Sequence, residues 1–168
     1  MEHRNYKSDL SAIVHLVPAV GSAAELGWPQ MPWQITMWTC TRRNAYVASY
    51  DGTTATNCYN DNGKIHVLLD NHGLGPGVLH VEFTAYEPNP AFADGSRKSV
   101  VTCGPQVELT ACSDDSSLPV NLFIQLPLGF PGTTLPGSGC DCGCTCDEVA
   151  SVDEVLQIID GLFDPDKE

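Results

Sequence analysis

The chain has 168 residues and a formal net charge of −13, from 8 basic and 21 acidic side chains. A chain of this length suits one ordinary domain with an appendage, and it can bury a hydrophobic core without disulfides. The charge argues against nucleic acid and anionic membrane surfaces as partners, because both are bound through clustered Lys and Arg. No apolar run reaches the roughly 18 residues that are needed to cross a bilayer.

The negative charge is unevenly distributed. Residues 140–168 contain nine acidic side chains and one basic side chain, a net charge of −8, whereas residues 1–139 have a net charge of −5. The cysteines divide in the same way, with four dispersed through residues 1–139 and four in an alternating run at positions 140–146. The C-terminal segment is therefore predicted to be a module distinct from the rest of the chain.

The start of the chain lacks the pattern of a secretory signal. Residues 12–20 form a short apolar stretch, but Asp9, His15 and Pro18 are out of place in or beside a signal-peptide core. We therefore expect synthesis in a cytoplasm, where thiols are mostly reduced. The four dispersed cysteines, at positions 40, 58, 103 and 112, are expected to be small buried core residues.

Short β-branched and aromatic runs recur along residues 12–126 and are separated by turn signals such as Asp51-Gly52 and Asn62-Gly63. In the run 78–86, the apolar residues alternate with His80, Glu82 and Thr84, which are expected to lie on the opposite face of the strand. No helix-period segment interrupts the runs, so a βαβ unit is not expected. The pattern predicts a mainly β, Ig-like or jelly-roll-like sandwich, with strands near 12–17, 33–41, 45–50, 54–59, 64–70, 78–86, 99–103, 106–111 and 120–126.

The composition divides the chain into four segments. Residues 1–30 are expected to be an N-terminal arm or first-strand region, and residues 31–127 the β-sandwich domain. Residues 128–146 are rich in Pro, Gly and Cys and are predicted to be a linker. Residues 147–168 are predicted to be a short acidic helix.

The helix prediction comes from apolar residues spaced 3, 4, 3 and 4 apart, which is the spacing of a seam between helices. Ser151 and Glu154 match a capping box, and Pro165 ends the helix. A helix of about three turns is marginal alone in water, so its apolar side needs a cover. Packing against the β domain, docking in a partner's groove and bundling with other copies all remain open. The expected oligomer interface consists of Val149, Val152, Val155, Leu156, Ile159, Leu162 and Phe163.

The alternating cysteine run has three possible roles. Four thiolates on one side of an extended chain could bind Zn²⁺ or Cu(I), so Cys140, Cys142, Cys144 and Cys146 are the candidate metal ligands. They could also form interchain disulfides, or serve as a reduced, flexible connector. We expect no resident metal or cofactor.

Few other residues suggest chemistry. His66, His72 and His80 have no metal-ligand spacing and are expected to be structural, with His66 and His80 as possible cross-strand neighbours. Gly73, Gly75 and Gly77 are expected to form a tight connection with positive φ. No catalytic motif is present, so an enzyme is not expected.

The tryptophans Trp33 and Trp38 are separated by an odd number of residues on one expected strand. They should therefore face opposite sides of the sheet, with one in the core. The other could be an exposed aromatic side chain for contact with a sugar or a protein.

The region from Trp33 to Ser99 resembles a recurring module of phages that infect gut Bacteroides-type bacteria, including crAss-like phages. The similar motifs include the strand Tyr46–Tyr50 with Asp51-Gly52, Asn57-Cys58 and the loop from Asp70 to Gly75. The long loop from Phe92 to Gly95 is also similar, as is the tail with its Gly/Cys-rich connector and Asp160-Gly161-Leu162-Phe163.

This resemblance implies a structural protein of the virion, located at the capsid surface after synthesis in the bacterial host cytoplasm. We expect a homotrimeric head-fibre subunit whose partners are copies of itself and the major capsid protein or another fibre protein. A tail-fibre or baseplate adaptor is an alternative, as is a carbohydrate-binding or adhesin-type module. The resemblance implies no catalytic residue.

Overall fold

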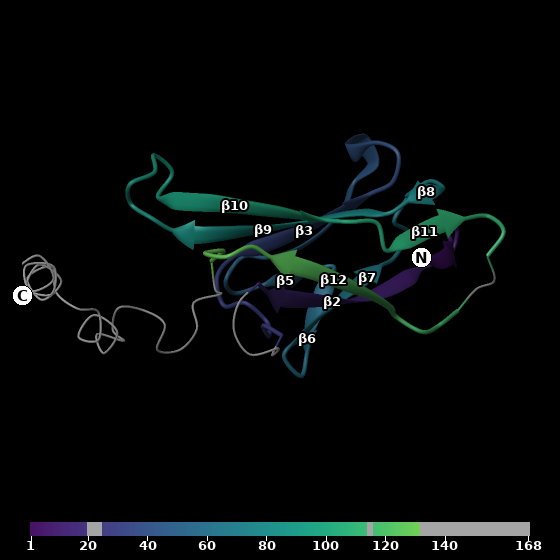
Figure 1. Ribbon diagram of the computed structural model, residues 1–168, viewed down its shortest axis with the longest axis horizontal. Helices are drawn as coiled ribbons and strands as arrows, with labels where there is room; N and C mark the ends of the chain where they lie inside the picture. Colours follow the sequence, from purple (N-terminus) through teal and green to yellow (C-terminus); the bar gives the residue numbers. More distant parts are fainter. Residues whose placement is uncertain (20–24, 114–115, 132–168) are drawn as a thin grey trace, which may run out of the picture. The chain divides into compact units, whose positions relative to one another are not determined.

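The computed structural model describes residues 1–19, 25–113 and 116–131, which belong to the first of two units, Met1–Thr133. These residues form a mainly β body with one short 3-10 helix, η1 (Arg42–Asn44). Figure 1 shows the strands arranged in layers. No helix in these ranges is long and apolar enough to cross a membrane.

Two sheets form the layers of the body (Figure 1). The four-stranded sheet has the order β12 (Val120–Leu126), β2 (Leu10–Pro18), β7 (Lys64–Leu69), β6 (Cys58–Asp61). The five-stranded sheet has the order β10 (Ser96–Cys103), β9 (His80–Pro88), β3 (Trp33–Trp38), β4 (Tyr46–Tyr50), β5 (Ala55–Thr56). A smaller sheet has the order β1 (Glu2–Asn5), β11 (Val107–Thr110), β8 (Gly77–Val78).

The inner faces of the two larger sheets share one hydrophobic core, which gives the body a sandwich-like architecture. The longer strands supply alternate residues to it, because successive side chains of a strand point to opposite faces, whereas the two residues of β5 are exposed. Strand β12 is the clearest example, since its buried and exposed residues alternate throughout. At the centre, the rings of Trp33 and Phe83 lie 6.0 Å apart, and the ring of Phe130 lies 5.9 Å from that of Phe83.

The expected strand 54–59 is two strands in two different sheets. Asn57 has a positive φ of 58°, a conformation that Asn tolerates better than most residues. Its side-chain Nδ2 donates a hydrogen bond to the Val47 carbonyl at 2.8 Å, and its own carbonyl accepts one from the Leu68 amide at 2.9 Å. The chain therefore crosses at Asn57 from the five-stranded sheet to the four-stranded sheet.

Other boundaries also differ from the expected ones. The strand expected over 33–41 ends at Trp38, and η1 follows it. The strand expected over 78–86 is split into β8 and β9, and it begins at Gly77, where φ is 135°. Gly73 also has a positive φ, as expected, whereas Gly75 does not.

The N-terminal residues are integral to the sheets. Strand β1 pairs in parallel with β11, and β2 lies between β12 and β7. Residues 2–5 and 10–18 therefore fit the first-strand alternative for this region. The linker was expected over residues 128–146, and its first residues are described: Phe130 is buried in the core. Residues 132–146 and the expected C-terminal helix, residues 147–168, lie outside the described residues.

Candidate binding surfaces

The first candidate surface is the outer face of the five-stranded sheet. On β9, Val81 and Phe83 point into the core, while His80, Glu82 and Thr84 point the other way, as the alternation predicted. Strand β3 shows the same division, with Trp33 in the core at 1% exposure and Trp38 half-buried on the outer side. The prediction that the two tryptophans face opposite sides is confirmed.

A compact cluster surrounds Trp38. The ring of His80 is stacked at 5.5 Å from the indole, and the guanidinium carbon of Arg42 lies 4.5 Å from the indole centroid. The Nη2 of Arg42 lies 2.8 Å from a carboxylate oxygen of Glu82, whose side chain is 13% exposed. The cation–π contact and the ion pair therefore hold η1 against the sheet.

This geometry bears on sugar recognition. Trp33 is too deeply buried to serve as a platform for a sugar ring. Trp38 is accessible only in part, because Arg42 and His80 already cover some of the indole. Its remaining exposed surface is one aromatic feature of this face that a sugar or a protein could contact, and the partly exposed ring of Tyr86 on β9 is another.

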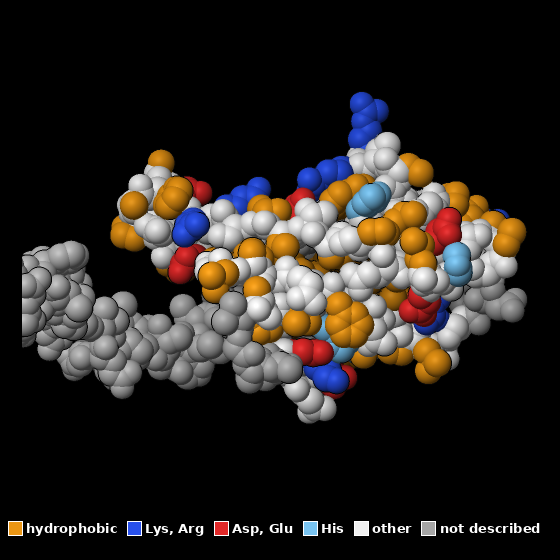
Figure 2. Space-filling view, in the orientation of Figure 1, with side chains coloured by type: hydrophobic (Ala, Val, Ile, Leu, Met, Phe, Trp, Pro, Cys, Tyr) orange, Lys and Arg blue, Asp and Glu red, His pale blue; other side chains and the backbone are white. Residues whose placement is uncertain are grey.

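The same face is positively charged. Arg43 in η1 and Lys98 in β10 are exposed and form no ion pair within the described residues. Figure 2 shows Lys and Arg side chains gathered along the side of the body formed by η1 and β10. We call the outer face of the five-stranded sheet, together with η1, the basic face; its charged residues are Arg42, Arg43, Glu82 and Lys98.

The second candidate surface is an apolar pocket of about 330 Å³. Its wall includes Leu26, Trp28 and Met31, from the segment before β3, together with Phe83 and Leu126 from the two sheets. None of the described residues that line it carries a charge. The pocket could therefore accept an apolar group.

The third candidate surface is the outer face of the four-stranded sheet. Phe123 is 46% exposed, and its ring stacks on His15 at 4.5 Å. The imidazole of His15 also lies within hydrogen-bond distance of Glu25 (2.7 Å) and Asn121 (2.9 Å). Tyr59 stacks on the His66 ring at 4.7 Å and hydrogen-bonds to its Nδ1 at 2.8 Å.

The histidines do not converge. His66 lies in the four-stranded sheet and His80 in the five-stranded sheet, so the expectation that they are cross-strand neighbours is wrong. The cause is a change of sheet between the two strands, because the chain leaves the four-stranded sheet after β7, passes through β8 in the small sheet and then enters the five-stranded sheet as β9. His72 instead fixes a loop, because its Nδ1 accepts a hydrogen bond from the Leu74 amide and its Nε2 lies 3.0 Å from the Ser8 carbonyl.

The four cysteines of the body are free thiols of two kinds. Cys58 and Cys103 are half-buried against the core, and burial raises the pKa of both thiols. Cys40 and Cys112 are exposed, so the prediction of buried core cysteines is wrong for these two. They lie just beyond strand ends, where alternation no longer determines burial. No group of three or more potential metal ligands occurs in the described ranges.

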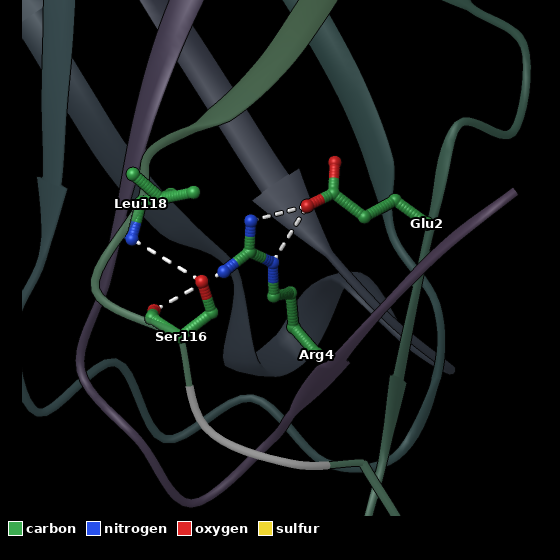
Figure 3. Close-up of polar contacts among 4 residues, drawn as sticks. All are labelled: Glu2, Arg4, Ser116 and Leu118. Atoms are coloured by element: carbon green, nitrogen blue, oxygen red, sulfur yellow. Dashed lines mark hydrogen bonds and ion pairs between the residues drawn. The ribbon is translucent and has the colours of Figure 1, made fainter.

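Arg4 is the buried charge that sequence reasoning missed. It is 5% exposed, and its Nε donates to Glu2 Oε1 at 2.7 Å while its Nη1 donates to the Ser116 carbonyl at 3.1 Å (Figure 3). The Ser116 hydroxyl in turn accepts from the Leu118 amide at 3.3 Å. Arg4 thus ties β1 to the segment before β12. A four-residue strand with two charged side chains gives no pattern from which this role could be predicted.

The candidate metal ligands Cys140, Cys142, Cys144 and Cys146 and the expected oligomer interface all lie outside the described residues. No protein-family model, curated protein or solved structure matches the chain.

Proposed function

We propose that this chain is a phage virion structural protein: a homotrimeric head-fibre subunit attached to the capsid shell. Its body would be a sandwich of the Ig-like or jelly-roll-like type, and its acidic C-terminal helix would associate with the helices of other copies. The partners are copies of the chain and the major capsid protein or another fibre protein.

The observation that carries this proposal is the direction of the chain through the body. Strands β2 and β12 pair in parallel, so their first residues lie at one end of the four-stranded sheet and their last residues at the other. The N-terminus lies beside β11 and the small sheet, whereas the chain leaves β12 at the opposite end (Figure 1). A body that the chain crosses from end to end suits a connector between two components of a particle.

A tail-fibre or baseplate adaptor would use the same connector geometry. A carbohydrate-binding module is the second candidate function, and the partly exposed Trp38 favours it. A glycan array distinguishes the two ideas, because sugar binding that Trp38→Ala abolishes would support the second candidate.

The mass of the full chain in solution tests the homotrimer. Light scattering after size exclusion should give three times 18.1 kDa, about 54 kDa. Leu156→Asp, in the predicted seam, should release the monomer, whereas the matched control Gln157→Asp, beside the seam, should not. A full chain that is monomeric at every concentration would refute the proposal.

A further inference from the structure

The basic face stands out in a chain with a net charge of −13. Residues 1–139 contain seven Lys and Arg side chains, and three of them belong to the basic face: Arg42, Arg43 and Lys98. Arg97, beside Lys98, occupies the alternate position of β10 and points to the other side of the sheet. Among the outward positions of the five-stranded sheet, Glu82 is the only acidic residue in the described strands, and Arg42 already pairs with it. The charges of Arg43 and Lys98 are therefore left uncompensated on this face.

The positive charges lie at two separated positions. Trp38, beneath Arg42, pairs with His80, whereas Lys98 pairs with Tyr86 on the same strand, β9. Six residues of β-strand separate these two pairs, a distance of about 20 Å. The intervening outer positions hold uncharged groups such as Thr84 and the 45% exposed Val100, apart from the paired Glu82.

Protection of a free sheet edge explains only part of this arrangement. Lys and Arg on an edge strand such as β10 discourage pairing with another chain. Arg43, however, lies in η1, which belongs to no sheet. A function for the combined charges therefore needs a negatively charged ligand.

We propose that the basic face binds the acidic C-terminal segment of a second copy of this chain. Residues 140–168 carry a net charge of −8, which complements the face. If residues 152–164 form the helix that the sequence predicts, between the cap at Ser151 and Pro165, they span about 20 Å, which matches the separation of the two positive positions. The seam residues Val152, Leu156 and Ile159 would remain available to other helices, because the acidic residues occupy other positions of the heptad. The inference rests on the proposed self-association and names a surface that it uses.

Carbodiimide crosslinking of the full chain tests this inference, since it joins a Lys amine directly to a carboxylate that contacts it. Equal amounts of ¹⁴N- and ¹⁵N-labelled protein are mixed, crosslinked at low salt and analysed by peptide mass spectrometry. Mixed-isotope links from Lys98 to peptides of residues 141–168 should exceed those from the exposed control residues Lys7 and Lys64 several-fold. NaCl at about 0.5 M should reduce them, because exposed charges are then screened.

Arg43→Glu should lower the yield at Lys98 several-fold, whereas the control Lys64→Glu should leave it unchanged. Equal yields at Lys7, Lys64 and Lys98 would overturn the inference, as would Lys98 links that join only peptides of the same isotope. A trimeric mass without Lys98 links would overturn this docking and leave the proposed function standing. A monomeric mass would instead refute the self-association itself.

Discussion

The buried indole of Trp33 gives the sharpest prediction about the core. Its Nε1 is buried and has no hydrogen-bond partner among the described residues. Leaving such a donor unpaired costs about 1–3 kcal/mol. Trp33→Phe removes this unpaired N–H group together with part of the ring. Removing the N–H group stabilises the fold, whereas losing the packed ring atoms destabilises it.

The two effects are of similar size. Trp33→Phe removes three side-chain heavy atoms, and a residual cavity of about 40 Å³ would cost about 1 kcal/mol at roughly 24 cal/mol per Å³. The lost apolar contacts add about 1 kcal/mol. The free energy of unfolding should therefore change by about 1 kcal/mol or less, in contrast to the loss of about 3–5 kcal/mol for Trp33→Ala.

Phe83→Leu is the matched control. It also removes three heavy atoms, from a ring that is 2% exposed and contacts Trp33, but it removes no polar group. Urea unfolding followed by circular dichroism should show a smaller loss of stability for Trp33→Phe than for Phe83→Leu. A loss for Trp33→Phe that exceeds the control by about 1 kcal/mol would refute the reasoning, because the indole N–H would then be making a favourable contact.

Three further predictions concern other parts of the body. Iodoacetamide at mildly alkaline pH should modify Cys40 before Cys58 and Cys103, because burial raises the pKa of the latter two thiols. Peptide mass spectrometry gives the order of modification, and equal rates at the three thiols would contradict the prediction. Arg4→Met should lower the free energy of unfolding by about 1–2 kcal/mol, because the Ser116 carbonyl loses a charged hydrogen-bond donor and water restores only part of that loss. Amide hydrogen exchange should accelerate in β1, and unchanged exchange there would count against the role of Arg4. Hydrogen bonds from the Thr54 and Thr53 amides lower the pKa of Asp51. The Asp51 carboxylate therefore stabilises the fold fully above its ordinary pKa, and this stabilisation is lost as the pH falls through the lowered pKa. Asp51→Ala should destabilise the protein more at neutral pH than in strong acid, and urea unfolding at the two pH values measures the difference.

Much of the β architecture could be predicted from the sequence, because apolar and polar residues alternate along a strand when one of its faces is buried. Strand β12 matches its predicted bounds, and the two faces of β9 were assigned correctly. The mainly β class follows from the same repeating pattern. These successes share one cause, namely that each of these strands buries one face in a common core.

The failures occur where the backbone turns or the pattern is short. No local signal in the sequence indicates that the chain changes sheets at Asn57, or that it changes again between β7 and β9, which separates His66 from His80. Strand β1 was missed because its stabilising partners, β11 and the Ser116 carbonyl, are more than 100 residues away in the sequence. Similarly, the η1 turn that carries Arg42 over Trp38 depends on tertiary contacts that spacing alone does not encode.

The proposed place of this chain in a virion is tested most directly on purified phage particles. An antibody fragment raised against the exposed loop that contains Phe92 should label particles from a phage that encodes this chain. In electron micrographs, we predict that the label decorates the capsid surface, at the base or along the length of fibres. Label at the tail would favour the adaptor alternative, and particles that contain no trace of the chain by mass spectrometry would contradict the proposed function.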